Sequence, residues 1–265
     1  MIRIFVEGVG LLGPGLSGWR ASRPVLAGGE SYRDAPTVVV ASELLPPAER
    51  RRTSVSVKLA LTVGHEAIVN AERDVAGMAT VFTSSCGDEN VHYICEALAS
   101  PEREVSPTRF HNSVHNAAAG YWGIATRSQE ASTSLCAYDA SFAAGLLEAA
   151  AQATVNRKPV ALIAYDQPYP EPLNTVRPIS APFGVALVVA PESTSRTFAV
   201  LDVTFEREME TPTRMPDFGL EAARIGAPAA RSLPLLAALA RGARENIVIE
   251  CGLRTQLRIA VAPCQ

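Results

Sequence analysis

The sequence SPTRFHNSVHNAAAGYWGIA, residues 106–125, carries the densest structural signal in the chain. Pro107 and the polar residues that follow it predict a loop, because proline and small polar side chains favour turns. Residues 116–124 are mostly small and apolar, which predicts a helix that packs closely against a neighbouring element. The segment therefore predicts a loop that leads into a tightly packed helix.

Two histidines of this segment, His111 and His115, lie four positions apart. That spacing occurs in the HExxH motif of zinc proteases, in which a glutamate follows the first histidine. Here the intervening residues are Asn112, Ser113 and Val114, so residue identity excludes that motif.

Upstream of this segment, the pattern alternates between strand and helix. Residues 2–10 predict a strand, and its glycine-rich exit lacks the Lys-Ser/Thr of a phosphate-binding loop, which favours a turn. Residues 21–50 contain four prolines and predict a connection with one short strand at residues 37–41. Residues 51–71 have the length and apolar face of a helix, capped by Thr53 or Ser54.

Residues 78–84 predict a short strand, and a polar turn after it leads into a helix over residues 88–99. His92 and Cys95 lie three positions apart on that helix. A structural zinc site needs four ligands, and no further ligand stands at a useful spacing. We therefore expect no metal site.

Downstream, residues 132–156 predict a short strand, a sharp turn and a long Ala/Leu-rich helix. Residues 159–168 and 182–191 are apolar without alternation, as in central strands covered on both faces. A strand at 198–205, a helix at 232–243 and a hairpin of strands 246–251 and 256–261 complete the pattern, while residues 206–230 indicate only a loop and a short helix. This order predicts an α/β domain with a mixed sheet.

Composition excludes several classes of protein. The net charge of −3 gives no basic field for nucleic acid, and no run of eighteen apolar residues predicts a membrane span. The N-terminus shows no signal-peptide pattern. The five scattered cysteines are expected to be reduced thiols of a cytoplasmic protein, and no cofactor site is predicted.

The order of these motifs resembles the β-ketoacyl synthases of fatty-acid and polyketide synthesis. VEGVGLLGPG, RRTS before a helix, and SPTRFHNSVHNAAAG match the family's opening strand, its helix and its "SP…SVHNAAAG" segment in sequence order. The resemblance implies the thiolase-like N-terminal half of a ketosynthase. We expect a mixed five-stranded sheet with helices on both faces and a C-terminal β-hairpin. Residues 1–190 would form the ketosynthase-like domain, and residues 191–265 an extension of two strands, a helix and a hairpin packed on it.

Two departures from the family argue against catalysis by this chain alone. A complete ketosynthase carries two catalytic histidines in its second half, whereas no histidine follows His115 here. The family's Cys-Ala-Ser/Thr-Gly nucleophile turn is replaced by CAYDAS at residues 136–141. Alignment from the upstream strand places Cys136 at the nucleophile position, and alignment from the downstream helix places Asp139 there. Cys136 is either the nucleophile or a buried structural thiol.

The resemblance thus implies a non-catalytic subunit, similar to the chain-length factors of aryl-polyene-type pigment pathways. Its partners would be a full-length ketosynthase or a second copy of itself, and an acyl carrier protein. The helix at 116–125 and the strand at 132–135 are expected at the interface. The predicted interface and acyl-tunnel residues are His115, Asn116, Tyr121, Trp122, Leu135 and Phe142. Tyr121 and Trp122 fit the pattern of core aromatics equally well.

Two other functions remain open at this point. The chain could be an acyl-thioester transferase that uses Cys136, with His111 or His115 as base, which requires hydrogen-bond reach between the two side chains. Alternatively, it could be a homodimeric scaffold that binds acidic carrier proteins through the basic cluster Arg50–Arg52.

Overall fold

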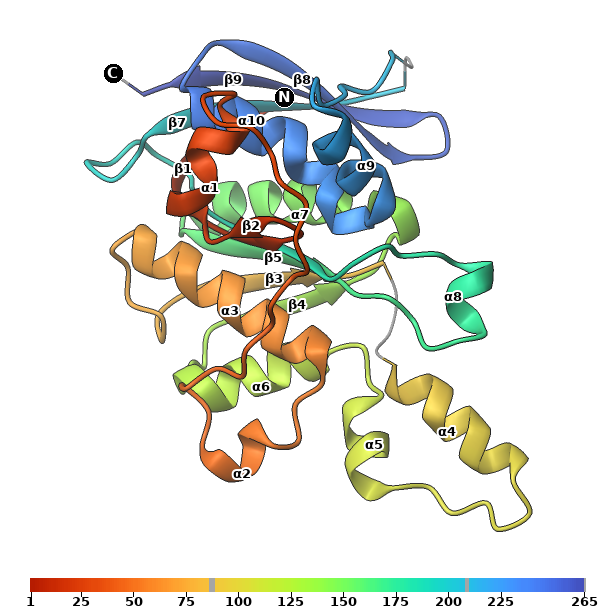
Figure 1. The fold of residues 1–265 in the computed structure, drawn as a ribbon. Coiled ribbons are helices and arrows are strands. Elements are labelled where there is room, and N and C mark those ends of the chain that lie inside the picture. Colours follow the sequence, from red (N-terminus) through yellow and green to blue (C-terminus); the bar gives the residue numbers. More distant parts are fainter. Residues whose placement is uncertain (86–88, 208–209, 265) are drawn as a thin grey trace.

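The apolar runs of the sequence become strands of a single sheet in the computed structural model of the chain, which describes residues 1–85, 89–207 and 210–264 (Figure 1). Within these residues the sheet has nine strands in the order β4-β3-β5-β6-β1-β7-β9-β8, and the short β2 pairs with β1. The strands are β1 (Ile2–Gly13), β2 (Leu16–Ser17), β3 (Ala79–Thr83), β4 (Ser132–Leu135), β5 (Val160–Asp166), β6 (Phe183–Ala190), β7 (Ala199–Glu206), β8 (Glu245–Gly252) and β9 (Thr255–Pro263).

Helices cover both faces of this sheet (Figure 1). They are α1 (Trp19–Leu26), α2 (Pro47–Arg50), α3 (Val55–Asn70), α4 (Asn90–Ala99), α5 (Pro107–Asn112), α6 (Ala117–Thr126), α7 (Ser141–Asn156), α8 (Leu173–Val176), α9 (Phe218–Gly226) and α10 (Leu233–Arg241), with 3₁₀ turns η1 (Tyr138–Ala140) and η2 (Pro228–Ser232). Alternate residues of β5 serve the two faces: Leu162 packs with α7, whereas Ile163 packs with α3 and α6. This double coverage explains the continuous apolar run of β5.

The predicted mixed sheet with helices on both faces is confirmed, but it has more than the five strands expected. β4, β3 and β5 are parallel, and β6 is antiparallel to both β5 and β1. The additional strands come from the C-terminal segment, because β7 pairs with residues 2–6 of β1 and β9 pairs along β7. The predicted C-terminal hairpin is confirmed as β8 and β9, which join the same sheet.

β1 contains two glycines that allow α3 to pack directly on its backbone. A Cβ atom placed on Gly8 would lie 2.0 Å from the carbonyl oxygen of Ala67, and one on Gly10 would lie 2.0 Å from that of Val63. Both carbonyls belong to α3, which begins after the cap that Ser54 provides through the amide of Val57. The glycines therefore fix the separation of this helix from the sheet.

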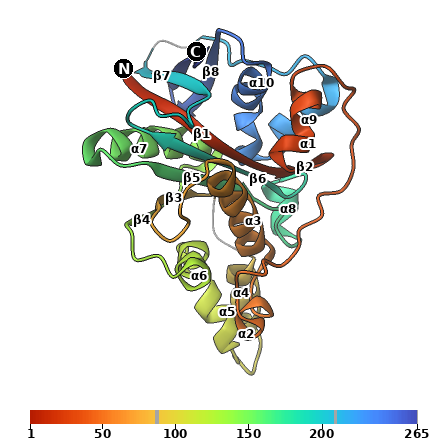
Figure 2. The same cartoon turned by 90° about the vertical axis from the view of Figure 1, so that its left-hand side faces the viewer.

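The sheet curves so that α7 and α10 lie inside it (Figure 2). α7 packs on β3, β5, β6 and β1, and it also contacts β8 near the other end of the sheet. One apolar cluster joins α7 and α10 to β5 and β6 on one side and to β8 and β9 on the other. β8 and β9 thus cover α7.

The two edges of the sheet differ. At β8, the amide of Thr213 donates to the carbonyl of Val248 (3.0 Å), and the amide of Val248 donates to Thr213 Oγ1 (2.9 Å). At the opposite edge, β4 pairs only with β3 among the strands of the described residues. One edge is therefore bonded to a neighbouring segment and the other is open.

α4 and α5 project from the body next to α6, and we call them the arm (residues 90–112) (Figures 1 and 2). In α4 only Asn90 is buried, and in α5 only Asn112. Within residues 1–85, 89–207 and 210–264, no helix has the length and apolar character needed to cross a bilayer.

Two expectations need comment. Residues 37–41 belong to no sheet, so the strand predicted there is wrong; the Thr37 hydroxyl donates to the Pro182 carbonyl (2.8 Å) and holds this extended segment by a side-chain contact. Cys95, Cys136, Cys251 and Cys264 are free thiols, whereas Cys86 lies outside the described residues.

Candidate functional site

The carboxyl ends of the parallel strands β4, β3 and β5 meet beside the start of α7. Ligands of open α/β sheets bind at this edge, outside the carboxyl ends of the strands. Here Ser84 and Ser85 follow β3, Asp166 ends β5, and residues 136–140 connect β4 to α7. We call residues 136–141 the elbow.

Cys136 begins the elbow and is exposed. Its thiol donates to the main-chain carbonyl of Ser85 at 3.1 Å. The ring of His111 meets Tyr121 edge-on, with 6.4 Å between ring centroids, and within the described part of the chain neither His111 nor His115 bonds to Cys136. The recorded hydrogen bond of the Cys136 thiol is therefore to a main-chain carbonyl and not to a side chain that could act as a general base.

Tyr138 occupies the conformationally unusual position of the elbow. Its φ of +54° lies in the left-handed region, which costs a non-glycine residue about 1 to 3 kcal/mol. The sequence pointed to Cys136 or to Asp139, and Tyr138 stands between them. The 3₁₀ turn η1 connects β4 to α7 at this point.

A cluster of charged side chains holds the elbow. The guanidinium carbon of Arg177 lies 3.7 Å from the centre of the Tyr138 ring, and the same side chain pairs with Asp139. Arg231 of η2 pairs with the second oxygen of Asp139 (3.1 Å) and with Glu250 of β8 (3.0 Å). The two arginine side chains are 22% and 21% exposed and Asp139 is 35% exposed, so solvent screens their pairs with Asp139 less than it screens fully exposed pairs.

Asp166 is connected to the elbow through Ser85 and is 3% exposed. Its Oδ1 accepts the amide of Ser85 and its Oδ2 accepts the amide of Ala229, each at 2.7 Å. Burial raises the pKa of Asp166 from 3.8 to about 6, against the opposing effect of these hydrogen bonds. The carboxyl group therefore joins β3, β5 and η2.

Comparison with protein families gives a match over residues 22–245 to the family "Beta-ketoacyl synthase, N-terminal domain". The chain belongs to this family. No curated protein sequence matches it. The predicted resemblance to β-ketoacyl synthases is thereby confirmed for most of the chain, including η2 and α10 of the C-terminal segment.

Solved structures show the same ketosynthase fold. The chain is similar to one in the structure of a ketosynthase (ApeO) in complex with its chain length factor (ApeC) from Xenorhabdus doucetiae, with a TM-score of 0.75 and 24% identity over 98% of this chain and 100% of that one. The ishigamide ketosynthase/chain length factor gives 0.72 and 14% identity, with 99% of both chains covered. A β-ketoacyl synthase from Burkholderia phymatum gives 0.61 and 13% identity, with 86% of this chain and 71% of that one covered. The predicted thiolase-like ketosynthase fold is confirmed.

The residues predicted for an interface or acyl tunnel occupy different environments in this ketosynthase-family chain. Tyr121 and Trp122 are each 2% exposed and Phe142 is 1% exposed, so all three pack inside the chain. The Tyr121 hydroxyl donates to Asn112 (3.0 Å), and Trp122 meets Phe82 edge-on. The two aromatics therefore occupy core positions and offer a partner almost no surface.

The other three predicted residues are more accessible. His115 and Leu135 are half-buried, whereas Asn116 is exposed. His115 precedes α6, and Leu135 ends the open edge strand β4. These three residues are accessible enough to contact a partner, and we retain the interface role for them as a proposal.

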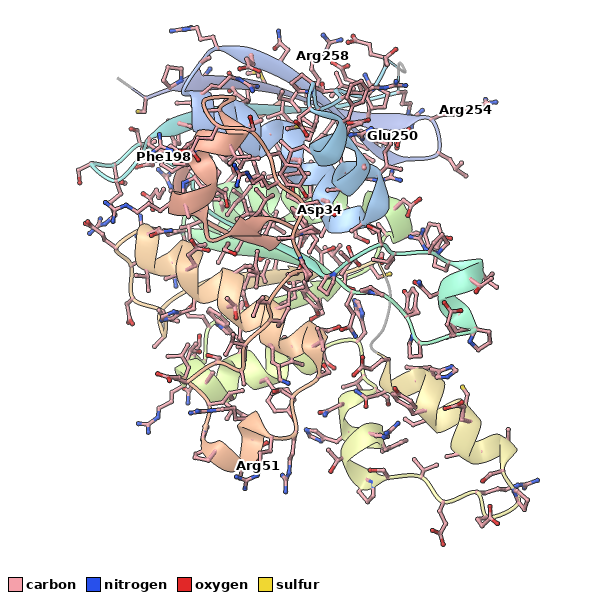
Figure 3. The ribbon with its side chains drawn as sticks, viewed as in Figure 1. Asp34, Arg51, Phe198, Glu250, Arg254 and Arg258 are labelled. Atoms are coloured by element: carbon pink, nitrogen blue, oxygen red, sulfur yellow. The ribbon has the colours of Figure 1, made fainter. Side chains whose placement is uncertain are left out.

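The basic cluster predicted at Arg50–Arg52 is divided by the fold. Arg50 donates to the carbonyls of Glu43 (3.3 Å) and Leu45 (3.1 Å), which holds the preceding loop. Arg52 pairs with Glu49, while Arg51 is exposed beside α2 (Figure 3). A carrier protein would find one or two of these charges accessible, which weakens the docking hypothesis.

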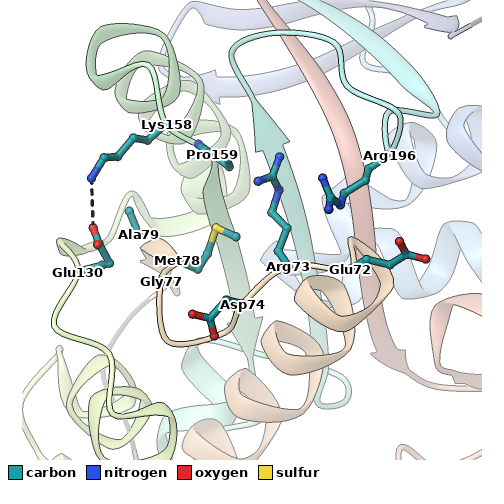
Figure 4. A pocket seen from close by; sticks show the side chains of 10 residues that line it. All are labelled: Glu72, Arg73, Asp74, Gly77, Met78, Ala79, Glu130, Lys158, Pro159 and Arg196. Atoms are coloured by element: carbon teal, nitrogen blue, oxygen red, sulfur yellow. Dashed lines mark ion pairs between the residues drawn. The ribbon is translucent and has the colours of Figure 1, made fainter.

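A polar pocket of about 280 Å³ lies away from the elbow, beside the start of β3 (Figure 4). Its cations are Arg73, Lys158 and Arg196, and its carboxylates are Glu72, Asp74 and Glu130. Lys158 pairs with Glu130 (3.8 Å), and Arg73 pairs with the buried carboxylate of Glu7. Balanced charges make this pocket a structural junction rather than an anion site. In the part of the chain that the structure describes, no group of three or more potential metal ligands exists.

The buried Asp166 predicts a specific dependence of stability on pH. Because its pKa in the folded chain is about 6 and its ordinary value is 3.8, its stabilising contribution is complete below about pH 4 and is lost as pH rises through about 6. The free energy of unfolding of the wild type, relative to Asp166→Asn, should therefore fall by about 2 kcal/mol from pH 4 to pH 7. Urea titrations followed by circular dichroism measure this difference.

Asp202→Asn is the matched control for that titration. Arg3 lowers the pKa of Asp202, so its contribution is present above its ordinary value and is lost only as pH falls further. The difference for this control should stay flat from pH 5 to pH 7. A flat difference for Asp166→Asn over the whole range would contradict the prediction.

Proposed function

We propose that this chain is a non-catalytic, chain-length-factor-like subunit that pairs with a full-length ketosynthase in polyketide synthesis of the aryl-polyene type. The observation that carries the proposal is the elbow. Tyr138 holds its left-handed position, Arg177 and Arg231 lock Asp139, and the Cys136 thiol is bonded to a carbonyl. This arrangement replaces a nucleophile with a fixed, charge-paired surface.

The chemistry of condensation supports the same conclusion. A condensing enzyme needs an activated nucleophile and groups that move protons or stabilise the developing oxyanion. All four histidines lie at or before His115, so residues 116–265 supply no histidine for these roles. The Xenorhabdus structure is a complex of a ketosynthase with its chain length factor, and the chain matched there has a length similar to this one.

The partner surface proposed for this chain combines the open edge of β4 with the arm and α6. An open strand edge presents unpaired main-chain groups, and proteins usually cover such edges. The arm and the adjoining loop and helix expose large apolar side chains, and α6 contacts β4. They are Val91 (45%), Leu98 (53%), Phe110 (66%), Val114 (52%) and Ile124 (46%). Apolar exposure on this scale is typical of an interaction surface.

Co-expression with a full-length ketosynthase and an acyl carrier protein of the same biosynthetic set tests the proposal. We expect the isolated chain to catalyse neither malonyl decarboxylation nor condensation, and to co-purify with the ketosynthase as an active complex. In that complex, Cys136→Ala should leave activity unchanged, whereas replacement of the partner's nucleophile should abolish it. Condensation by the isolated chain that disappears in Cys136→Ala would instead establish an autonomous acyltransferase.

A second copy of this chain is the alternative partner, and native mass spectrometry distinguishes the two assemblies. The proposal predicts a 1:1 complex of unequal subunits when both proteins are present. A stable homodimer that does not exchange with the ketosynthase would contradict it.

A further inference from the structure

Asp166 bonds to two main-chain segments that lie far apart in the sequence. Its two oxygens accept the amides of Ser85, after β3, and of Ala229, in η2. The carboxyl group is 3% exposed, so water hardly competes for these bonds. Each of the two segments in turn contacts the elbow.

The segment after β3 holds both ends of the elbow. The carbonyl of Ser85 accepts the Cys136 thiol at 3.1 Å, and the carbonyl of Ser84 lies 3.0 Å from the Ser141 hydroxyl. The same hydroxyl accepts the amide of Ala137 at 3.0 Å. Any movement of the peptide groups of Ser84 and Ser85 is therefore transmitted to the elbow at two points.

The η2 segment holds the middle of the elbow. Arg231 follows Ala229 by two residues in this turn and pairs with Asp139 at 3.1 Å. The hydroxyl of Ser232 donates to the carbonyl of Ala229 at 2.7 Å, which keeps the turn compact. The amide held by Asp166 and the guanidinium that holds the elbow therefore belong to one small rigid unit.

We propose that Asp166 is the positioning residue of the elbow, acting through the Ser85 peptide on one side and through Arg231 of η2 on the other. A left-handed tyrosine persists only when its surroundings over-determine its conformation. Asp166 fixes the two segments whose contacts hold Tyr138 in this conformation. The inference concerns the isolated chain and does not depend on the proposed partner.

The proposal assigns the C-terminal segment a part in this site. Ala229 and Arg231 come from η2, and Glu250, which pairs with Arg231 at 3.0 Å, comes from β8. The elbow would consequently lose its support if η2 moved, even with β3, β4 and α7 in place. A purely structural buried carboxylate would affect all elements that it touches to a similar degree.

Amide hydrogen exchange on the isolated chain tests the proposal, with peptides that resolve residues 136–141, residues 226–232 and the core strand β6. In Asp166→Asn, the amides of the elbow and of η2 should exchange about tenfold faster or more, while β6 exchanges as in the wild type. The rate at which iodoacetamide alkylates Cys136, measured on its own peptide, should rise in parallel, because its bond to the Ser85 carbonyl weakens.

Arg231→Gln provides the second variant, since it removes the contact to Asp139 while leaving Asp166 intact. It should accelerate exchange in the elbow while β6 exchanges as in the wild type, and Arg231→Lys should restore most of the protection by keeping the charge pair. The matched control is Arg258→Gln at the C-terminal strands (Figure 3). It breaks a pair with Glu206 and should leave the elbow unchanged. If Asp166→Asn does not fold, elbow exchange in Arg231→Gln and Arg231→Lys tests the proposal on its own.

The effects of the Asp166 and Arg231 substitutions on the exchange rate of the elbow should also be non-additive. The double variant Asp166→Asn, Arg231→Gln should accelerate elbow exchange by less than the product of the two single effects, because both act through η2. Three outcomes would overturn the proposal: faster exchange in η2 with a protected elbow, uniform acceleration that includes β6, or an elbow that is insensitive to Arg231→Gln.

Discussion

Gly10→Val is expected to remove the folded state of the chain. The new Cβ would lie 2.0 Å from the carbonyl oxygen and 2.9 Å from the carbonyl carbon of Val63. Both are main-chain atoms in the middle of α3, so they cannot move without displacing the whole helix from β1. Severe overpacking of a core costs more than about 4 kcal/mol, a large part of the 5 to 15 kcal/mol of a typical domain.

Far-UV circular dichroism and urea denaturation measure this effect. Gly8→Val should behave in the same way, because its Cβ would meet the carbonyl oxygen of Ala67 at 2.0 Å. The matched control is Gly120→Ala in α6, where a Cβ meets nothing within 4 Å and an alanine favours the helix by up to about 1 kcal/mol. A cooperative, near-wild-type transition for Gly10→Val would show that α3 does not pack on β1 as described.

The double variant Phe110→Asp, Val114→Asp is expected to abolish the complex with the ketosynthase while leaving this chain folded. Both side chains are exposed, at 66% and 52%, so charges there cost the isolated chain little. In a desolvated interface each charge would be unpaired, and losses of 2 kcal/mol or more per central residue give a weakening of about a hundredfold or more.

Pull-down yield and the dissociation constant from biolayer interferometry report the loss. The matched control is Phe218→Asp at the start of α9, where the side chain is 93% exposed and lies away from the arm (Figure 1). Binding that survives the arm substitutions but fails in Phe218→Asp would place the partner on the C-terminal side of the molecule instead.

The periodicity of the sequence predicted most of the strands and helices because local pattern determines them. Residues 159–165 are apolar at every second and every intervening position, and β5 is indeed covered on both faces. The size of the sheet escaped prediction, because β7 and β9 pair with segments far away in the sequence. Alternating strands of this kind look the same whether they extend one sheet or form a separate one.

The elbow shows where prediction from sequence ends. Its location followed from the strand–turn–helix pattern around Cys136, but the left-handed residue is Tyr138. The residues that hold it, Arg177 and Arg231, come from a loop after β5 and from η2. Arginine–carboxylate pairs across such separations leave no local pattern, so only the folded chain brings them together. Asp166 was recognisable as the end of a buried strand, but not as a contact to Ala229.

The difference between the two sheet edges limits how many chains can assemble. Because Thr213 already bonds to Val248 in the middle of β8, we expect further strands to be added beside β4. If each chain offers one free strand edge, pairing stops after two chains have joined, because the free edge of each chain is then covered by the other. Pairing through β4 would therefore give a closed complex of two chains, and a continuous ribbon of sheets could not propagate. Unblocking β8, for example with Thr213→Pro, which removes both the amide and the hydroxyl that bond to Val248, would create a second growing end and with it a risk of fibre formation.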